Sequence, residues 1–293
     1  MNFCKDRVVI ITGAGAGLGK AYALELASQG ASVVVNDIRL EAAQEVVAEI
    51  AALGGRGLAN GDDITTIAGA EKIVRATVDQ FNTVHALVNN AGVLRDKMFV
   101  GLTEEDWDMV VRVHMRGHFC LANTLANYWR DLSKAGNPVD ARIINTSSGA
   151  GLQGSIGQSN YAAAKGGIAT LTLVQASELA RYGITANALA PAARTAMTLA
   201  GMPDLVKKPE DGSFDHYDPA NVASFVAWLV SESSKHVSGQ IFEVDGDRIC
   251  ICEGWKSGPA LKKGGSRWES TELTAVVDQL IKQSKPAQKV WGS

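Results

Sequence analysis

The sequence predicts an α/β protein built on one doubly wound, mostly parallel sheet, with helices on both faces and a C-terminal helical extension. Short apolar runs alternate with longer helical patterns along most of the 293 residues, and a glycine-rich turn follows the first run. No Pro/Gly/Ser-rich linker divides the chain. Regular alternation of this kind is typical of parallel sheets whose crossover helices cover both faces. We therefore expect one sheet domain over residues 1–246 and an extension over residues 247–293.

The predicted strands are short apolar runs rich in β-branched residues. Residues 7–12 read RVVIIT, a continuous run that indicates a strand buried on both faces. Residues 32–37 (SVVVND) have the same character. Further strands are expected at 56–62, where the pattern is weak, and at 85–90, 141–146, 184–190 and 239–244, the last of which should end the sheet.

The predicted helices fill the intervals between these strands. The clearest, over residues 40–53, places Ala43, Val46, Val47 and Ile50 near a 3.6-residue period. Others are expected at 18–29, 66–80, from about 104 through 120, 160–182 and 219–231.

Two segments interrupt the alternation of strands and helices. Residues 192–218 form a long connection, and connections of this length are usually functional. Its apolar residues include Met197, Leu199 and Met202. The tail at 247–293 contains one amphipathic helical pattern that needs a surface to pack on, either the core or a subunit neighbour. The apolar positions of that pattern are Leu273, Val276, Val277, Leu280 and Ile281.

The composition is that of an ordinary soluble globular protein, with 46% apolar and 20% charged residues. A formal net charge of −3 indicates neither a nucleic-acid-binding protein nor a basic membrane-surface protein. The first apolar run is too short for a signal peptide or a membrane span. We therefore expect a cytoplasmic protein.

The cysteines and histidines predict no metal site. Four cysteines are scattered apart from one C-x-C pair, which favours a reducing compartment over a disulfide framework. They are Cys4, Cys120, Cys250 and Cys252. His114 and His118 stand four residues apart, but they lack the glutamate of H-E-x-x-H and an evident third ligand. We interpret His118 and the neighbouring Arg116 as facing a packing surface or a subunit neighbour.

The glycine-rich turn predicts a phosphate-binding loop. Residues 12–19 read TGAGAGLG, directly between a predicted buried strand and a predicted helix. Glycines let the backbone turn sharply and approach a ligand closely, and the helix N-terminus offers unpaired N–H groups to a pyrophosphate. The alternative is an ordinary tight turn.

The second predicted strand ends in an acid that favours NAD over NADP. Asp37 lies about 20 residues beyond the glycine turn, where dinucleotide-binding folds place a carboxylate on the ribose hydroxyls. A carboxylate there repels a 2′-phosphate, and neither Ala16 nor Ile38 supplies a cation for that group. Arg39 is the residue that leaves some use of NADP open. The alternative role for Asp37 is a turn residue.

Three side chains form a candidate proton-transfer group. Tyr161 and Lys165 stand four residues apart and share a helix face, while Ser148 follows a predicted strand. A nearby ammonium favours the phenolate, so we expect Lys165 to lower the pKa of Tyr161 from its usual value of about 10. Ser148 could hold a substrate oxygen while the tyrosine removes a proton.

These motifs, in this order, resemble those of the short-chain dehydrogenase/reductase family. The shared motifs are T-G-x-x-x-G-x-G, N-N-A-G at 89–92, a serine and Y-x-x-x-K, and the resemblance covers about residues 6–246. It implies a single Rossmann-type domain that acts on a CH–OH group, with Ser148, Tyr161 and Lys165 as catalytic residues. It also implies the residues that contact the NAD cofactor: Gly13, Gly17, Leu18, Gly19, Asp37, Asp63, Ile64, Asn90, Ala91, Gly92, Tyr161, Lys165 and Pro191.

The fourth catalytic position points to one branch of the family. Residues 110–120 (VVRVHMRGHFC) place His114 where the family usually has asparagine. This stretch, with 88–99, 154–167 and 266–269, is similar to the (3R)-hydroxyacyl-CoA dehydrogenase units of multifunctional enzyme type 2, a group that includes type 4 17β-hydroxysteroid dehydrogenase. In the wider family the asparagine acts through its main-chain carbonyl and a water relay, and histidine has the same carbonyl.

The resemblance implies NAD-dependent oxidation of a 3-hydroxyacyl-CoA to the 3-oxoacyl-CoA, and it leaves open a steroid-derived or other bulky acyl group. The alternatives are a dehydrogenase of free hydroxysteroids or other secondary alcohols, and a non-catalytic dinucleotide-sensing protein. Lys262, Lys263 and Arg267 could meet CoA phosphates or form a solvated surface. The family is usually dimeric or tetrameric, joined through helices around 104–130 and 160–182. No hydratase domain follows, which favours a stand-alone relative.

Overall fold

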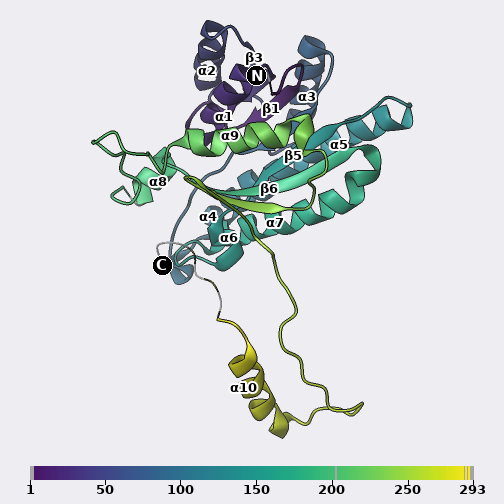
Figure 1. Ribbon diagram of the computed structural model, residues 1–293, viewed down its shortest axis with the longest axis vertical. Coiled ribbons are helices and arrows are strands. Elements are labelled where there is room, and N and C mark those ends of the chain that lie inside the picture. Colours follow the sequence, from purple (N-terminus) through teal and green to yellow (C-terminus); the bar gives the residue numbers. More distant parts are fainter. Residues whose placement is uncertain (1–2, 202, 287, 289, 291–293) are drawn as a thin grey trace.

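The computed structural model describes residues 3–201, 203–286, 288 and 290. Met202, which the sequence places in the apolar connection, lies outside the described residues. The predicted α/β class is confirmed, because helices cover both faces of a mostly parallel sheet (Figure 1). None of the described helices is long and apolar enough to cross a membrane.

Within the described residues, eight strands form one sheet in the order β3-β2-β1-β4-β5-β6-β7-β8. Neighbours from β3 to β7 pair in parallel, and β8 pairs with β7 in the antiparallel direction. The strands are β1 (Val8–Thr12), β2 (Ser32–Asn36), β3 (Arg56–Asn60), β4 (Ala86–Asn89), β5 (Ala141–Thr146), β6 (Ile184–Ala192), β7 (Ile241–Asp245) and β8 (Arg248–Ile251).

The sequence prediction that the sheet ends at residue 244 is wrong. The chain turns at Gly246, whose φ of +59° lies in the left-handed region that glycine tolerates. It then returns as β8, with Val244 opposite Ile249. This edge strand is mostly exposed. An exposed edge strand does not need the continuous apolar run by which the buried strands are recognised in the sequence.

The helices match the predicted intervals, with one interruption and two additions. They are α1 (Gly17–Ser28), α2 (Leu40–Ala52), α3 (Ile67–Phe81), α4 (Glu104–Val111), α5 (Gly117–Lys134), α6 (Gly149–Gln153), α7 (Ser159–Leu179), α8 (Ala196–Gly201), α9 (Pro219–Val230) and α10 (Leu273–Gln283). A π-helical turn at Arg112–Arg116 interrupts the helix expected from residue 104. The short helices α6 and α8 were not predicted.

Successive residues of each central strand enter two separate cores. Ile11 and Val35 pack in the layer formed with α1, α2 and α9. Ile10 and Val34 pack in the layer formed with α3 and α5. Because both faces of the sheet are buried, its strands are continuous apolar runs without alternation.

The strand order places the predicted site residues at one edge of the sheet. The order reverses between β1 and β4, and ligands of open parallel sheets bind beyond the carboxyl ends of the strands at such a reversal. Gly13 follows β1, Asp37 follows β2 and Asn90 follows β4. Ser148 lies shortly after β5, and Pro191 is near the end of β6.

The C-terminal segment stands away from this body. Residues 252–285, here called the arm, run outward from β8, form α10 and turn back (Figure 1). The structure describes every residue of α10, and none of them is buried. The chain then returns to the body near its end, where Val290 is half-buried.

Candidate active site

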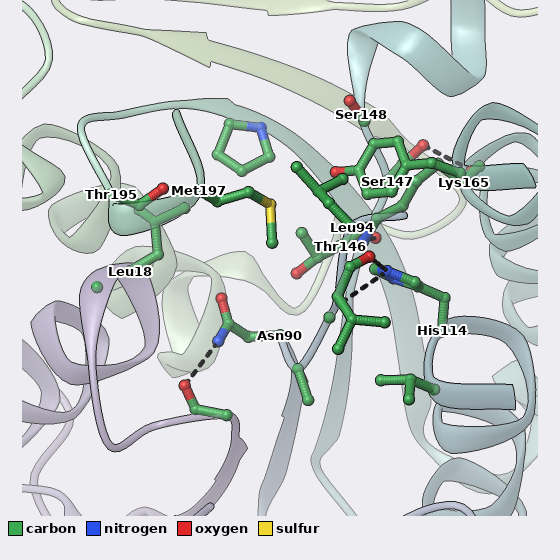
Figure 2. Close-up of a pocket in the computed structure, with 18 of the residues that line it drawn as sticks. Leu18, Asn90, Leu94, His114, Thr146, Ser147, Ser148, Lys165, Thr195 and Met197 are labelled. Atoms are coloured by element: carbon green, nitrogen blue, oxygen red, sulfur yellow. Dashed lines mark hydrogen bonds between the residues drawn. The ribbon is translucent and has the colours of Figure 1, made fainter. Parts of the chain in front are cut away.

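A cavity of about 1020 Å³ lies at the carboxyl ends of the strands. All but one of the residues that the sequence predicts for catalysis or cofactor binding line it: Gly13, Gly17, Leu18, Asp37, Asp63, Ile64, Asn90, Ala91, Gly92, His114, Ser148, Tyr161, Lys165 and Pro191. Gly19 is buried directly behind the turn. Figure 2 shows Leu18 and Asn90 on one side of this space and Ser148 and Lys165 on the other.

The glycine turn is shaped by close backbone contacts. Gly13 has a φ of +61°, and a Cβ there would lie 2.8 Å from the Ala91 Cα. A Cβ on Gly19 would collide with the carbonyl oxygen of Gly13. Ala16 is the N-cap residue of α1, which the structure describes in full. Its side chain forms no capping hydrogen bond with the first N–H groups of the helix. The first N–H groups of α1 are therefore available to a phosphate, as the predicted loop requires.

Asp37 is held on the cavity wall beside the glycine turn by the backbone of that turn. Its Oδ2 accepts a hydrogen bond from the Gly15 N–H at 3.1 Å, and its Oδ1 accepts one from the Arg39 N–H at 3.0 Å. The Asp37 residue is buried, whereas the Arg39 side chain is mostly exposed and its Nε lies 3.4 Å from the same carboxylate. A carboxylate fixed in this way suits ribose hydroxyls and disfavours a phosphate.

The carboxylate of Asp63 already has partners. It accepts hydrogen bonds from the Thr65 N–H at 2.8 Å and the Thr65 hydroxyl at 2.9 Å. Asp63 thereby shapes the turn that leads into α3. The neighbouring Ile64 is buried and contributes apolar surface to the cavity.

Asn90 and Thr12 join the glycine turn to the end of β4. The Thr12 hydroxyl accepts hydrogen bonds from the Asn90 and Ala91 N–H groups, each at 3.0 Å. The Asn90 side chain donates to the carbonyl oxygens of Thr12 and Gly13, at 2.9 and 3.2 Å. This pairing fixes the floor of the cavity, and part of it is visible in Figure 2.

Tyr161 and Lys165 lie one turn apart on α7, as the spacing predicts. The Lys165 Nζ donates to the Thr146 carbonyl oxygen at 2.6 Å and lies 5.5 Å from the centre of the Tyr161 ring. Ser148 is the N-cap of α6, and its hydroxyl accepts a hydrogen bond from the Ala150 N–H at 3.2 Å. A second hydrogen bond links Ser148 to Tyr161. The three side chains therefore lie together on the wall of one cavity.

Burial shifts the two titratable groups in opposite directions. It raises the pKa of Tyr161 to about 12, although the hydrogen bond from Ser148 acts to lower it. Burial also lowers the pKa of Lys165 to about 7. The prediction that Lys165 lowers the pKa of Tyr161 below 10 is wrong for the protein chain without a bound cofactor. The reason is that desolvation of the phenolate dominates, while the ammonium is directed to the Thr146 carbonyl.

His114 occupies the π-helical turn and contacts both the cavity floor and the tyrosine. Its Nε2 lies 2.9 Å from the Val93 carbonyl oxygen, and its ring meets the Tyr161 ring edge-on at 5.2 Å. Burial, with a smaller contribution from the charge of Lys165, lowers the pKa of His114 to about 3. A Cβ on Gly92 would collide with the imidazole. His114 is therefore a neutral, tightly packed ring at neutral pH.

The second histidine of the pair is part of the core. His118 is buried, and its Nε2 lies 3.4 Å from the Thr146 N–H. Burial lowers its pKa well below the usual value. Arg116 is exposed on the helix surface. Among the described residues, no three His, Cys, Asp or Glu side chains are grouped so that they could hold a metal ion.

Of the other residues that line the cavity, the sequence indicated Met197 through the long apolar connection and missed the rest. Thr195 caps α8 with Thr198, whose hydroxyl donates to the Ala193 carbonyl oxygen at 2.9 Å, and Met197 points into the space (Figure 2). The long connection at 192–218 was the signal for these residues. Val290 also lines the cavity, and nothing in the sequence indicated it. The remaining apolar lining residues include Leu94, Met109, Val113 and Ile156.

The basic tail residues do not reach this cavity in the single chain. Lys263 forms an ion pair with Glu272 and lies over the Trp268 ring. Lys262, Lys263 and Arg267 all belong to the arm, and none of them lines the cavity. The suggestion that they meet CoA phosphates is thus not supported by their position.

Comparison with known proteins places this geometry among dehydrogenases. The short chain dehydrogenase family model matches residues 7–202. The hydroxyacyl-CoA dehydrogenase ChsB1 of Mycobacterium tuberculosis is 42% identical over 96% of this chain and 90% of its own length. The mouse peroxisomal multifunctional enzyme type 2 is 40% identical over 92% of this chain, which spans about a third of that enzyme (34%).

Two solved structures share the architecture. A short chain dehydrogenase from Mycobacterium avium aligns with a TM-score of 0.90 and 47% identity, covering 99% of this chain and 100% of its own. The 3-ketoacyl-(acyl-carrier-protein) reductase of Brucella melitensis, solved with NADH, aligns with a TM-score of 0.74 and 29% identity, covering 83% of this chain and 98% of its own. The first alignment includes the arm.

Proposed function

The chain belongs to the short-chain dehydrogenase family, and from that premise we propose that it oxidises a 3-hydroxyacyl-CoA to the 3-oxoacyl-CoA with NAD. One observation supports this proposal above all others. Ser148, Tyr161 and Lys165 share one cavity with the glycine turn and Asp37. Such an arrangement supports the proposal, because oxidation of a CH–OH group needs a proton acceptor beside the bound dinucleotide.

The residues around the glycine turn support the choice of NAD as cofactor. Bound NAD would supply the hydride acceptor. The uncapped N-terminus of α1 and the close backbone at Gly13 suit its pyrophosphate. Asp37 suits the ribose hydroxyls, because its carboxylate is fixed by the Gly15 N–H and would repel a 2′-phosphate. Arg39 is exposed beside it and has only a weak contact with that carboxylate.

The proton is handled by three side chains. Ser148 holds the substrate hydroxyl oxygen, and the Tyr161 oxygen takes the hydroxyl proton. Because burial raises the pKa of Tyr161 to about 12, its phenolate needs a nearby positive charge. Lys165 can supply that charge at neutral pH, where its pKa of about 7 leaves it partly protonated. His114 positions the tyrosine ring through the edge-on contact.

The substrate class is inferred from the apolar end of the cavity and from the relatives. Leu94, Ile156, Met197 and Val290 offer apolar surface for an acyl chain or a bulkier acyl group. We also propose a cytoplasmic homodimer or homotetramer joined through α4, α5 and α7. The sheet domain and the C-terminal extension would then be its two structural parts.

Steady-state assays test the proposed function. Purified protein and NAD are tested with 3-hydroxyacyl-CoAs from short chains to steroid-sized acyl groups. We expect NAD reduction with at least one of these thioesters. Turnover of free hydroxysteroids or other secondary alcohols, with no reduction by any 3-hydroxyacyl-CoA, would overturn the proposal.

A further inference from the structure

Asp96 is an acidic residue on the cavity wall that the proton transfer described above does not use. It lines the cavity together with Leu94 and Ile156, and it is exposed to solvent. Its Oδ2 accepts a hydrogen bond from the Gln158 Nε2 at 2.8 Å. Figure 2 shows Leu94, two residues earlier in the chain, on the side of the cavity that carries Ser148. The carboxylate therefore belongs to the part of the wall that carries the proton-transfer residues.

The backbone on both sides of Asp96 is tied to residues 157–160, which lead directly to Tyr161. The carbonyl oxygen of the preceding residue accepts a hydrogen bond from the Asn160 side chain at 3.1 Å. The N–H of the following residue donates to the Gly157 carbonyl oxygen at 2.9 Å. Asn160 is fully buried, so this anchor is part of the packed core. Asp96 is thereby held at a fixed position close to the catalytic tyrosine.

The negative charge of Asp96 has no cation beside it. The Arg95 guanidinium donates to the Leu94 carbonyl oxygen at 2.9 Å, and the Lys97 Nζ pairs with Asp106 at 2.6 Å. Across the described residues, no Lys, Arg or His nitrogen lies within ion-pair distance of the Asp96 carboxylate. The side-chain amide that donates to it is neutral. The charge therefore acts on whatever occupies the cavity.

The charge of Asp96 reaches the reacting centre. Burial raises the pKa of Tyr161 to about 12, and the negative charge of Asp96 acts in the same direction. A like charge nearby disfavours the ionised form of an acid, because two negative charges repel each other. A substrate that brings its own carboxylate into this part of the cavity meets the same repulsion, whereas a neutral carbonyl group does not.

The chemistry of the proposed substrate places C1 in this part of the cavity. In a 3-hydroxy acid or its thioester, a single carbon separates C1 from C3, so the two atoms lie about 2.5 Å apart. A C3 hydroxyl held by Ser148 and Tyr161 therefore brings C1 close to the same wall. In the free acid C1 belongs to a carboxylate at neutral pH, since a carboxyl group has a pKa of about 4. In a thioester C1 is neutral.

We propose that Asp96 is a specificity-determining residue that excludes free 3-hydroxy acids from the cavity by charge repulsion and admits neutral 3-hydroxyacyl thioesters. The inference rests on the function proposed above, because it concerns the C1 group of that substrate. Gln158 and the buried Asn160 hold the carboxylate in place. Repulsion of the wrong partner is a common source of specificity.

Calorimetric titration tests the exclusion without any need for turnover. Protein saturated with NADH is titrated with a 3-hydroxy acid and with its methyl ester, which differ in charge at C1 and carry no CoA. We expect wild type to bind the ester more tightly, and Asp96→Asn to tighten binding of the acid at least about tenfold relative to the ester. Asp108→Asn is the matched control, because Asp108 is an exposed acid of α4 outside the cavity lining. It should leave the ratio within about twofold of wild type.

Two outcomes of this titration would overturn the proposal. One is equal binding of acid and ester by wild type. The other is a ratio in Asp96→Asn that stays at the wild-type value or changes only because the ester binds more weakly. Neither outcome depends on CoA, so a failure of the proposed function, in which no 3-hydroxyacyl-CoA is oxidised, is recognised separately.

The salt dependence of the same ratio separates a charge effect from a structural one. The screening length falls from about 10 Å at 0.1 M salt to about 3 Å at 1 M, so the charge of an exposed carboxylate acts over a shorter range. We expect the preference of wild type for the ester to shrink several-fold between these concentrations, and that of Asp96→Asn to change less. An equal salt dependence in the two proteins would contradict a role for the Asp96 charge.

Discussion

Tyr161 is the residue on which the proposed chemistry depends most. Its pKa is raised by burial, and its ring meets the His114 ring edge-on in the cavity that Ser148 also lines. Perturbed pKa values in a cleft are typical of functional sites. Burial lowers the pKa of Lys165 to about 7, so its side chain is partly protonated at neutral pH.

We expect Tyr161→Phe to lower kcat by about 10²- to 10⁴-fold, the usual contribution of a positioned acid or base. Phenylalanine keeps the ring contact with His114 but has no group that can take a proton. Binding of NADH, measured by fluorescence titration, should stay within about twofold of wild type because the glycine turn and Asp37 are untouched. Near-wild-type turnover in this variant would disprove the acid/base role.

Asp37→Ala tests the selection of the cofactor. Removing the carboxylate removes its repulsion of a 2′-phosphate, which at about 4 Å near a protein surface is worth up to about 4 kcal/mol. We expect the ratio of kcat/KM for NAD to that for NADP to fall by at least about tenfold. The control is Asp62→Ala, which changes an acid on the neighbouring strand end. An unchanged ratio in Asp37→Ala would mean that another group selects the cofactor.

His114 links protonation to stability. Its pKa is about 3 in the folded chain and about 6.5 when unfolded, so the unfolded chain binds more protons between these values. The stability contributed by the neutral ring is complete above pH 6.5 and is lost as the pH falls toward 3. Lowering the pH from 7 to 4.5 should therefore cost wild type about 2 kcal/mol more than His114→Asn.

Urea denaturation at the two pH values measures this difference. The quantity compared is the loss of unfolding free energy between pH 7 and pH 4.5 in each protein. Any pH-independent cost of the substitution therefore cancels. His85 and His118 also have lowered pKa values and should leave a residual slope in the variant. Parallel curves of unfolding free energy against pH would exclude His114 as a contributor.

At the scale of elements, the contact between α6 and α7 sets the distance from Ser148 to Tyr161. A Cβ on Gly151 would lie 2.5 Å from the Gly166 N, and one on Gly166 would lie 2.8 Å from the Gly151 carbonyl oxygen. The two backbones therefore touch without side chains between them. Ser148 caps one helix and Tyr161 begins the other, so their separation follows from this contact.

We expect Gly151→Ala to displace α6 and reduce kcat by about 10²-fold, the effect of a shift near 1 Å in a reacting group. Its free energy of unfolding should fall by about 1–3 kcal/mol, as in other overpacked sites. Gly101→Ala is the matched control, because no described atom would lie within 4 Å of its Cβ. Equal activity and stability in the two variants would show that the helices are free to separate.

The sequence predicted the elements whose signal is local. β-Branched runs revealed β1, β2 and β5, since these strands are buried on both faces. The glycine turn and the Tyr161–Lys165 spacing revealed most of the site. The π-helical turn was missed because it spans only five residues inside a continuous helical stretch and has no sequence signature of its own. β8 was missed because it is an exposed edge strand.

The whole molecule brings together residues that no local pattern connects. The cavity is lined from Gly13 to Val290, and the strand order places the ends of β1, β2, β4 and β5 beside one another. Ligand sites at such a reversal of strand order could be expected from the alternation of strands and helices. The contribution of Val290 could not, because it depends on the path of the arm through space.

The oxidation of a 3-hydroxyacyl-CoA in this cavity is tested most directly by initial rates of NAD reduction with a matched pair of substrates. One is a 3-hydroxyacyl-CoA that the protein accepts, and the other is the same 3-hydroxy acid without CoA. We predict that kcat/KM for the thioester exceeds that for the acid by at least about 10²-fold, since binding energy from the handle lowers the barrier. We also predict that Tyr161→Phe abolishes most of both rates. Equal kcat/KM for the two substrates, or full activity in the variant, would contradict this account.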